Sequence, residues 1–323
     1  MNAKSLGLGA LAFLLAASTL LSIASAAEYP ARPIRMVIPW PPGGSTDIIG
    51  RILAVDLTAR LKQQVLIDNR AGAGSIVGLQ FATAAPPDGY TLMMTSTAYG
   101  FLIDKPKVPV DLVNSFAPVA MIGFGDSALV VHPSFPVKTV KDLIDLAKRR
   151  PGEILYASSG IGGFPHMNTE LFTLKTGAKM VHVPFKGGGP AIMDVIAGHT
   201  QINFGSVVTV LPHVQSGRLR LVATGGPKRN PKLPEVPAIA ETVPGYESQI
   251  WWGIFAPPRT APDVIARFHG ETMEVISTPL FQKRLDEQGG MVVKMSSAEF
   301  GKLMLAEQNK WLEVIRVAGI KGE

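Results

Sequence analysis

The residues best suited to chemistry lie in loops that combine glycine with serine, threonine and asparagine. The first loop, Pro41–Asp47, follows the apolar run Ile34–Ile38 and precedes a periodic apolar segment that predicts a helix. The loops Asn69–Ser75 and Ser158–Gly163 repeat this order. Backbone N–H groups at the start of such a helix have no partner inside the helix, and they attract anions. We therefore predict that these loops form an anion-binding site.

The predicted site also takes residues from the ends of neighbouring apolar runs. Ser96, Thr97 and Ser206 each stand where a predicted strand ends, and His166 lies in the first turn of a predicted helix. A structural role and a ligand role both remain open for His166. The predicted ligand-binding residues are Trp40, Pro41, Gly43, Gly44, Ser45, Thr46, Asp47, Ala71, Gly72, Ala73, Gly74, Ser96, Thr97, Ser158, Ser159, Gly160, His166 and Ser206.

These residues do not form a recognisable catalytic set. No serine, histidine and carboxylate stand at a spacing typical of nucleophilic catalysis, and no carboxylate pair stands out. Asp47 suits the first turn of a helix, where it complements the helix dipole, better than it suits a general base. We therefore predict binding without turnover and no catalytic residue. The alternative is an exported hydrolase that uses Ser158 or Ser96 with His166.

Composition argues against several other classes. The chain has no cysteine, so it has no disulfide, no thiolate nucleophile and no cysteine metal site. Its six histidines are not paired at metal-ligand spacing, and its formal charge of +6 is dispersed along the chain. The segment Gly72–Gly78 matches a dinucleotide fingerprint poorly, because its last spacing is one residue too long. We predict no metal, no cofactor and no nucleic-acid partner.

Strands alternate with helices along the chain, which predicts an α/β fold with ligands at the carboxyl ends of parallel strands. The segment Phe116–His132 is predicted as two strands around Gly123–Gly125, and Trp251–Ala256 as a strand that returns to the first domain. We predict two lobes, each a mostly parallel sheet flanked by helices, with a ligand cleft between them. Residues 27–125 and 252–323 form the first predicted lobe, and residues 126–251 the second.

The first 26 residues predict a secretory signal peptide. Lys4 precedes an apolar run from Leu6 to about Ile23, and the small residues Ala24-Ser25-Ala26 suit cleavage. The run is long for a signal peptide, so a retained membrane anchor is the alternative. Since no other stretch is long and apolar enough to span a bilayer, we expect the mature chain to be exported and soluble.

Short motifs spread along the chain resemble those of a known family. They are PWPPGGSTD at 39–47, NRAGAG at 69–74, DGYTL at 88–92, VPFKGG at 183–188, LPEVP at 233–237, WG at 252–253 and EQNKWLEVIRVAGIK at 307–321. In order and content they are similar to the tripartite tricarboxylate transporter substrate-binding family, the Bug proteins of periplasmic solute uptake. The resemblance covers essentially the whole mature chain.

This resemblance implies a two-lobed, type II-like periplasmic binding protein that closes on a small carboxylate by hinge motion. In the family, the loops that match Pro41–Asp47 and Asn69–Ser75 grip a ligand carboxylate through backbone amides. The resemblance also implies that a monomer delivers the carboxylate to the membrane permease subunits of the transporter. A sensor that feeds a membrane signalling partner would use the same cleft, and it stays an alternative.

Three positions depart from the usual family pattern. The second loop more usually reads Asn-Arg-Pro-Gly-Ala-Gly-Gly, whereas Ala71 here replaces the proline and Ser75 the final glycine. Trp40 stands where phenylalanine is commoner. A carboxylate grip built from backbone should survive these changes, so we expect them to alter the shape of the pocket and the choice of ligand.

Overall fold

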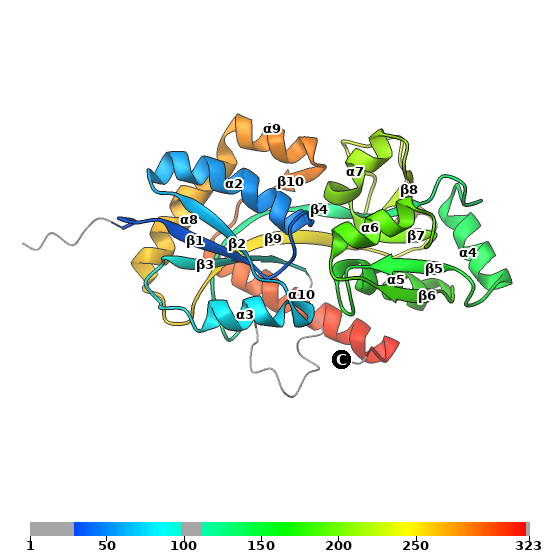
Figure 1. Ribbon diagram of the computed structural model, residues 1–323, viewed down its shortest axis with the longest axis horizontal. Helices are drawn as coiled ribbons and strands as arrows, with labels where there is room; N and C mark the ends of the chain where they lie inside the picture. The colour runs from blue at the N-terminus through cyan, green and yellow to red at the C-terminus, as the bar shows by residue number, and fades with distance from the viewer. Residues whose placement is uncertain (1–28, 98–111, 321–323) are drawn as a thin grey trace, which may run out of the picture. The chain divides into compact units, whose positions relative to one another are not determined.

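Two long neighbouring strands organise the fold: β4 (Ala117–Val131) and β9 (Gln249–Ala256), which pair antiparallel. The computed structural model that shows this describes residues 29–97 and 112–320. All helices and strands named below belong to one compact part of the chain, which begins at Arg32. The predicted signal peptide, residues 1–26, lies outside the described residues. Figure 1 shows β4 and β9 running between two groups of strands and helices.

The first lobe contains the strands β1 (Ile34–Ile38), β2 (Val65–Asn69) and β3 (Thr91–Ser96). β1 pairs parallel with both β2 and β3, while β3 pairs antiparallel with β9. The other elements of this part are α2 (Ser45–Leu61), the 3-10 turn η1 (Ala73–Ser75), α3 (Ile76–Thr83), α8 (Pro262–Ser277), α9 (Pro279–Glu287), β10 (Gly290–Val292) and α10 (Ser297–Ala318). α2 packs against α8 and α9, and its start lies at the carboxyl end of β1.

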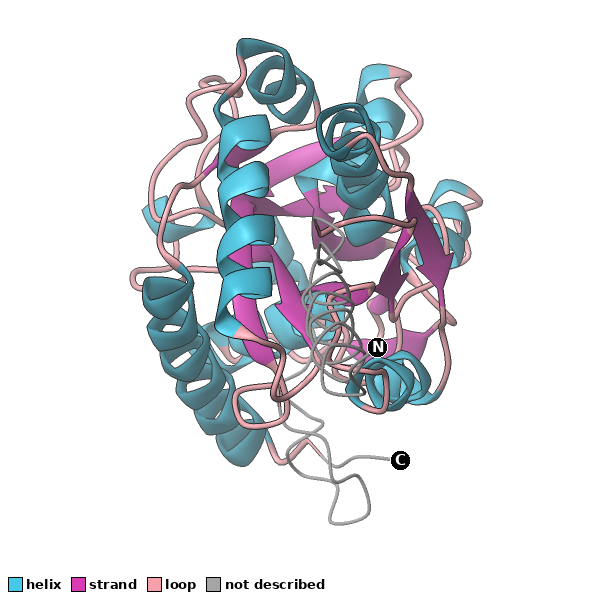
Figure 2. Ribbon diagram, turned by 90° about the vertical axis from the view of Figure 1, so that its left-hand side faces the viewer, coloured by secondary structure: helices cyan, strands magenta, loops and turns pink. Residues whose placement is uncertain are grey.

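The second lobe contains β5 (Leu155–Ser158), β6 (Val181–Pro184), β7 (Ile202–Ser206) and β8 (Arg220–Thr224). β5 pairs parallel with β6 and β7, while β4 pairs antiparallel with β7 and β8. The helices here are α4 (Val140–Arg149), α5 (Phe164–Thr176), α6 (Gly188–Ile196), α7 (Val207–Gln215) and the 3-10 turn η3 (Ile239–Glu241). The strand order is β2-β1-β3-β9-β4-β7-β5-β6, with β8 and β10 paired to β4. Figure 2 shows helices around these strands.

β4 is a single strand of 15 residues, so the prediction of two strands in this segment is wrong. Its glycines serve close packing instead of a turn. A Cβ atom at Gly123 would collide with the carbonyl oxygen of Met291 in β10, and one at Gly125 would lie 2.8 Å from Cη2 of Trp252. β4 pairs with β9 and β10 up to Asp126, and with β7 and β8 beyond it, so one strand passes from lobe to lobe.

Each lobe has its own buried core, and α10 contributes to both. Phe300 of α10 packs with Val37 in the first lobe, whereas Trp311, further along the same helix, packs with Phe172 in the second. The second half of α10 thus lies against the core of the second lobe. The fold is mixed α/β with two lobes. Within residues 29–97 and 112–320, no helix is both long and apolar enough to cross a bilayer.

Candidate functional site

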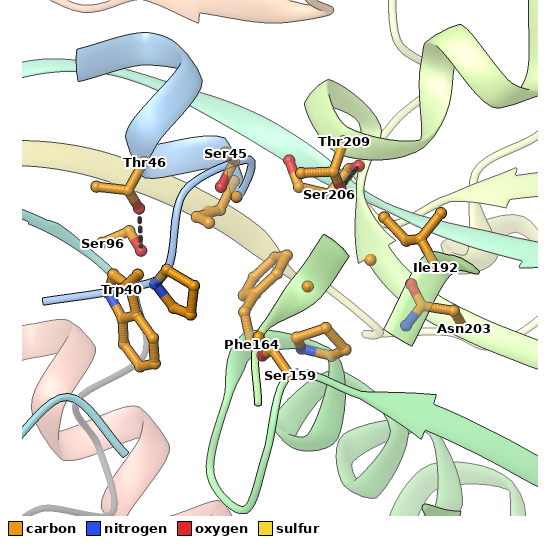
Figure 3. Close-up of a pocket in the computed structure, with 17 residues that line it drawn as sticks. Trp40, Ser45, Thr46, Ser96, Ser159, Phe164, Ile192, Asn203, Ser206 and Thr209 are labelled. Atoms are coloured by element: carbon orange, nitrogen blue, oxygen red, sulfur yellow. Dashed lines mark hydrogen bonds between the residues drawn. The ribbon is translucent and has the colours of Figure 1, made fainter. Parts of the chain in front are cut away.

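A pocket lies at the carboxyl ends of β1, β3, β5, β6 and β7, between residues of the two lobes (Figure 3). We call it the inner pocket; its volume, including the opening to solvent, is about 580 Å³. It is lined by Trp40, Pro41, Gly44, Ser45, Thr46, Ser96, Ser159, Phe164, Pro165, Gly187, Gly188, Ile192, Asn203, Gly205, Ser206, Thr209 and Ile250. None of these described lining residues carries a charge, so neutral groups must provide whatever recognition takes place here.

A second pocket adjoins the first, and we call it the outer pocket. Trp40, Pro41, Ser159 and Gly187 line both pockets, and so form their common boundary. The remaining lining residues are Pro39, Ala71, Gly72, Gly74, Ser75, Gly160, Ile161, Pro184, Phe185 and Lys186. Among the described residues of this lining, Lys186 is the charged side chain.

Four helices start at the inner pocket without a side-chain cap. Their N-cap residues are Gly44 of α2, Gly163 of α5, Gly187 of α6 and Ser206 of α7. The three glycines have no side chain that could cap a helix, and the Ser206 side chain makes no capping hydrogen bond. By contrast, α4 and α10 begin away from the pocket and have complete capping boxes at Thr139 and Ser296. Uncapped first turns leave N–H donors and the positive ends of helix dipoles for a ligand. The inner pocket therefore suits an anion, although its described lining has no cationic side chain.

Asp47 holds the first two loops together. Its carboxylate accepts hydrogen bonds from Gly43 N at 3.0 Å, from Arg51 Nε at 3.0 Å and from Asn69 Nδ2 at 3.0 Å. Asn69 Nδ2 also donates to the carbonyl oxygen of Trp40. Burial raises the pKa of Asp47, but the hydrogen bonds from Arg51, Gly43 and Asn69 outweigh it and hold the pKa below its usual value. Asp47 thus stays ionised, and its carboxylate oxygens are occupied by these hydrogen bonds. It is therefore suited to positioning the two loops and not to acting as a general base.

Three of the four predicted hydroxyl residues of the first lobe line the inner pocket, and the fourth, Thr97, does not. Thr46 Oγ1 donates to Ser96 Oγ at 3.0 Å, and both residues line the inner pocket (Figure 3). Ser45 lines the same side of the pocket. Thr97 lies elsewhere, because its Oγ1 accepts a hydrogen bond from the backbone N–H of Trp251 at 3.0 Å and it lines neither pocket.

Behind the third loop, two histidines stack on each other. The rings of His166 and His182 lie 4.0 Å apart with an interplanar angle of 4°. Gly162 N donates to His166 Nδ1 at 2.8 Å, and Ser158 Oγ lies 2.5 Å from His182 Nε2. The Ser158 hydroxyl also bonds the backbone of Gly160. Both histidines therefore stabilise this loop, and His166 lines neither pocket.

Burial controls the protonation of this pair. It lowers the pKa of His166 to about 3, with a further contribution from neighbouring His182, and it lowers the pKa of His182 to about 4. Tyr156 stacks on His182 at 4.9 Å and donates to Glu170 Oε1 at 2.7 Å, so its ring closes one side of the stack. Both histidines are neutral at neutral pH. The accepting Nδ1 of His166 then places its ring proton on Nε2, which lies 3.8 Å from Glu170.

The described part of the site contains binding groups and no complete reacting set. Ser158 pairs with His182, but Ser158 is fully buried and lines neither pocket. Ser96 lines the pocket, where it accepts from Thr46 and has no hydrogen bond to a histidine. No group of three His, Cys, Asp or Glu residues within residues 29–97 and 112–320 is placed to hold a metal ion. Neutral donors that surround an apolar space can hold an oxyanion.

The structure brings most of the predicted residues to the two pockets. Trp40, Pro41, Gly44, Ser45, Thr46, Ser96, Ser159 and Ser206 line the inner pocket, and Ala71, Gly72, Gly74 and Gly160 line the outer one. Five of the predicted residues line neither pocket: Gly43, Asp47, Thr97, Ser158 and His166. They form hydrogen bonds within the loops or, in the case of Thr97, with the backbone of β9. Ala73 lies in η1 between two residues of the outer pocket.

Sequence reasoning missed the apolar wall that the second lobe and β9 provide. Phe164, Ile192 and Ile250 line the inner pocket, together with Asn203 and Thr209. The apolar three resemble ordinary core residues in the sequence. Asn203 carried a usable signal, since it is a polar residue inside the buried strand Ile202–Ser206. Its Nδ2 donates to the carbonyl oxygen of Ala157 at 2.8 Å, which fixes the amide at the pocket wall.

Comparison with known proteins identifies the family. The "Tripartite tricarboxylate transporter family receptor" family, TctC, matches residues 49–320. Protein BugT of Bordetella pertussis is 34% identical over 301 residues, which cover 92% of this chain and 92% of that protein. R. palustris Rpa4515, whose structure holds adipate, is 30% identical with a TM-score of 0.88, over 91% of this chain and 99% of that one. The periplasmic binding protein BugD is 26% identical with a TM-score of 0.85, over 91% and 100% of the two chains. The chain therefore belongs to the tripartite tricarboxylate transporter receptor (TctC) family, the Bug proteins, which are two-lobed periplasmic solute-binding proteins.

Proposed function

We propose that this protein captures a small carboxylate in the cleft formed by the inner and outer pockets. The observation that carries the proposal is the gathering of four uncapped helix starts around a pocket with no charged side chain in its described lining. A carboxylate accepts hydrogen bonds from the first-turn amides and is stabilised by the helix dipoles. The adipate held by a relative that is 30% identical supports the same ligand class.

In this proposal the start of α2 grips the carboxylate. The amides of Gly44, Ser45 and Thr46 supply donors from the first lobe, while the starts of α6 and α7 face them from the second. The lobes, proposed as residues 27–125 with 252–323 and residues 126–251, close on the ligand as β4 and β9 flex. The protein acts in the periplasm as a monomer. It passes the carboxylate to the permease subunits of a tripartite tricarboxylate transporter and carries out no reaction on it.

A ligand panel tests the binding function. The mature protein is unfolded, dialysed and refolded, so that any ligand carried through purification is removed. It is then heated with each member of a panel of mono-, di- and tricarboxylates. A ligand at about 100 times its dissociation constant adds roughly 2.7 kcal/mol to the free energy of unfolding, which raises the melting temperature clearly. Calorimetric titration then gives the affinity, and mass spectrometry of the recovered ligand shows whether it is unchanged. A refolded protein that no carboxylate stabilises would contradict the proposal.

Replacing Gly187 by alanine is expected to weaken carboxylate binding about 10- to 30-fold. Gly187 has φ +125° and touches the first lobe, since a Cβ atom there would lie 2.9 Å from Cγ of Pro41. An added methyl group both strains the backbone and holds the lobes apart. Gly189→Ala, two residues further on in the first turn of α6, is the control, because a Cβ atom at Gly189 meets nothing within 4 Å. Calorimetric titration compares the variants. Equal affinity in Gly187→Ala and wild type would show that this contact is not needed for closure.

A further inference from the structure

A buried carboxylate lies where the fold passes from one lobe to the other. Asp126 is 2% exposed, and it stands at the point of β4 where pairing with β9 ends and pairing with β7 and β8 begins. Asn230 Nδ2 donates to Asp126 Oδ2 at 2.9 Å, and Gln249 Nε2 donates to Asp126 Oδ1 at 2.8 Å. Both partners are neutral, and burial raises the pKa of Asp126. A buried carboxylate held by neutral groups depends on its hydrogen bonds, so these two amides determine the structure at the crossing point.

This carboxylate lies on the face of the sheet that is turned away from the ligand pocket. Gln249 and Ile250 are neighbours in β9, and Ile250 lines the inner pocket. Because successive side chains of a strand point to opposite faces, Gln249 and the carboxylate that it binds lie on the other face. Asp126 lines neither pocket. Its hydrogen bonds therefore act on the strands that join the lobes and not on the ligand.

One loop of the second lobe packs over Asp126. We call it the strap; it comprises residues 225–236, which follow β8. A Cβ atom at Gly226 would lie 2.7 Å from Asp126 Oδ1, so the backbone of the strap lies directly against the carboxylate. Arg229 holds the strap to the second lobe through two hydrogen bonds to the carboxylate of Glu241 in η3, at 2.8 and 2.9 Å. The strap is thus fixed both to the strand that joins the lobes and to the second lobe.

The strap also reaches the first lobe. Asn230 Oδ1 accepts a hydrogen bond from the backbone N–H of Lys232 at 2.9 Å, which fixes the turn that carries the lysine. Lys232 Nζ lies 2.6 Å from Asp286 Oδ2 in α9, a helix of the first lobe. Among the ion pairs formed by residues 29–97 and 112–320, this one joins the two lobes, whereas the others lie within one lobe or within α10. Asn230 therefore connects the buried carboxylate of the crossing strand with the ion pair between the lobes.

We propose that the strap couples the two lobes and favours the arrangement in which they close on the ligand, with Asn230 and Lys232 as its positioning residues. The ion pair is formed here while the lobes also touch at the cleft, where Gly187 packs against Pro41. A rotation of one lobe against the other would separate Lys232 from Asp286. A contact that is made in one arrangement and lost in another shifts the population toward the first. The inference rests on the proposed function for the role of closure in binding, but the coupling itself is measurable without ligand.

Distances between the lobes test the coupling in the ligand-free protein. The chain has no cysteine, so Val55→Cys and Lys148→Cys provide two specific sites for spin labels. Both positions are exposed, and they lie in α2 of the first lobe and α4 of the second (Figure 1). Pulsed electron paramagnetic resonance then gives the distribution of distances between the labels. Lys232→Glu should broaden the distribution relative to wild type, because two carboxylates then face each other across the lobes.

Exchanging the charges separates this contact from a general effect of charge. Asp286→Lys alone should also broaden the distribution, whereas Lys232→Glu combined with Asp286→Lys should restore the wild-type distribution, because the ion pair forms again with its charges reversed. Lys283→Glu is the matched control. It makes the same change of charge in α9, but Lys283 pairs with Glu287 of the same helix, so the distribution should not change.

A buried variant tests the connection to the crossing strand. Asn230→Ala removes both the donor to Asp126 and the acceptor for the turn of Lys232, so it should broaden the distribution as Lys232→Glu does. Combining the two changes should add little, because they break the same chain of contacts. If Asn230→Ala does not fold, the surface variants at Lys232 and Asp286 still decide the proposal, since they leave the buried hydrogen bonds of Asp126 in place.

The affinity for the best carboxylate of the panel should follow the distances. Lys232→Glu should bind it about 5- to 20-fold more weakly than wild type, and the charge-exchanged variant should bind it within about threefold of wild type. An unchanged distribution in Lys232→Glu, a failure of the exchange to restore it, or a broadened distribution with unchanged affinity would each overturn the strap proposal and leave the carboxylate-binding function standing. If wild type binds no carboxylate while the strap variants change the distances as expected, the proposed function falls and the coupling of the lobes is supported.

Discussion

Replacing Ser45 by aspartate is expected to weaken carboxylate binding at least about 100-fold and to leave the fold intact. Ser45 is the first residue of α2, it is 8% exposed, and it lines the inner pocket. The new carboxylate would occupy the anion site at the uncapped start of α2 and would repel the carboxylate of the ligand. Two like charges a few ångströms apart in this pocket are strongly unfavourable, because its described lining has no cationic side chain to offset their repulsion.

The stability of this variant separates loss of binding from loss of folding. An acidic residue in the first turn of a helix complements the helix dipole, which offsets the cost of burying the new carboxylate, so ligand-free Ser45→Asp should melt near the wild-type temperature. Ser45→Asn is the matched control, since asparagine has nearly the same shape without the charge. It should keep affinity within about tenfold of wild type. Calorimetry with the best ligand of the panel gives both affinities. Equal losses in the two variants would show that shape, and not charge, governs this position.

The first-lobe side of the site could be predicted because its signal is local. In Pro41–Asp47 and Asn69–Ser75, glycine and hydroxyl residues follow directly after a strand. A strand followed by a glycine loop and a helix places backbone amides at the edge of the sheet, independently of the rest of the chain. The role of Asp47 in joining these two loops could not be predicted in the same way. It depends on the spatial approach of Asn69, which lies 22 residues away.

The second-lobe side was harder to predict because its signals conflict with local propensity. α7 begins with Val207, Val208 and Thr209, which are β-branched and poor helix formers, and it contains Pro212. The helix forms because Val207, Val208 and Val210 become fully buried, so tertiary packing outweighs propensity. Thr209 reaches the pocket on this unpredicted helix. For the same reason, a sequence pattern alone could not place the uncapped N-terminus of α7 at the ligand site.

The stacked pair His166 and His182 should make the stability of the protein depend on pH. Burial lowers both pKa values, to about 3 and about 4, whereas an exposed histidine in the unfolded chain titrates near 6.5. Below pH 6.5 the unfolded state therefore binds more protons than the folded state. The stability that the neutral pair maintains is complete above about pH 6.5 and is lost as the pH falls toward the folded pKa values. The groups that face the stack include Tyr156 and Glu170, and the carboxylate of Glu170 lies 3.8 Å from His166 Nε2.

Removing both histidines should flatten this pH dependence. In His166→Asn the amide oxygen replaces the Nδ1 acceptor for Gly162 N–H, and in His182→Gln the amide replaces Nε2 beside Ser158. Between pH 6.5 and pH 4.5 the wild type should lose on the order of 4 kcal/mol more unfolding free energy than the double variant, since each histidine contributes at most about 1.4 kcal/mol per pH unit and about half of that near pH 6.5, where the unfolded histidine is half protonated. Urea unfolding at several pH values measures this difference, in which carboxylates such as Asp47 cancel. Parallel slopes for wild type and the double variant would mean that the two histidines are protonated in the folded protein as easily as in the unfolded one, which would contradict the prediction.

The histidine pair also holds the loop that carries Ser159 and Gly160 to the pockets. Protonation of the pair at acid pH should therefore loosen this wall of the cleft before the protein unfolds.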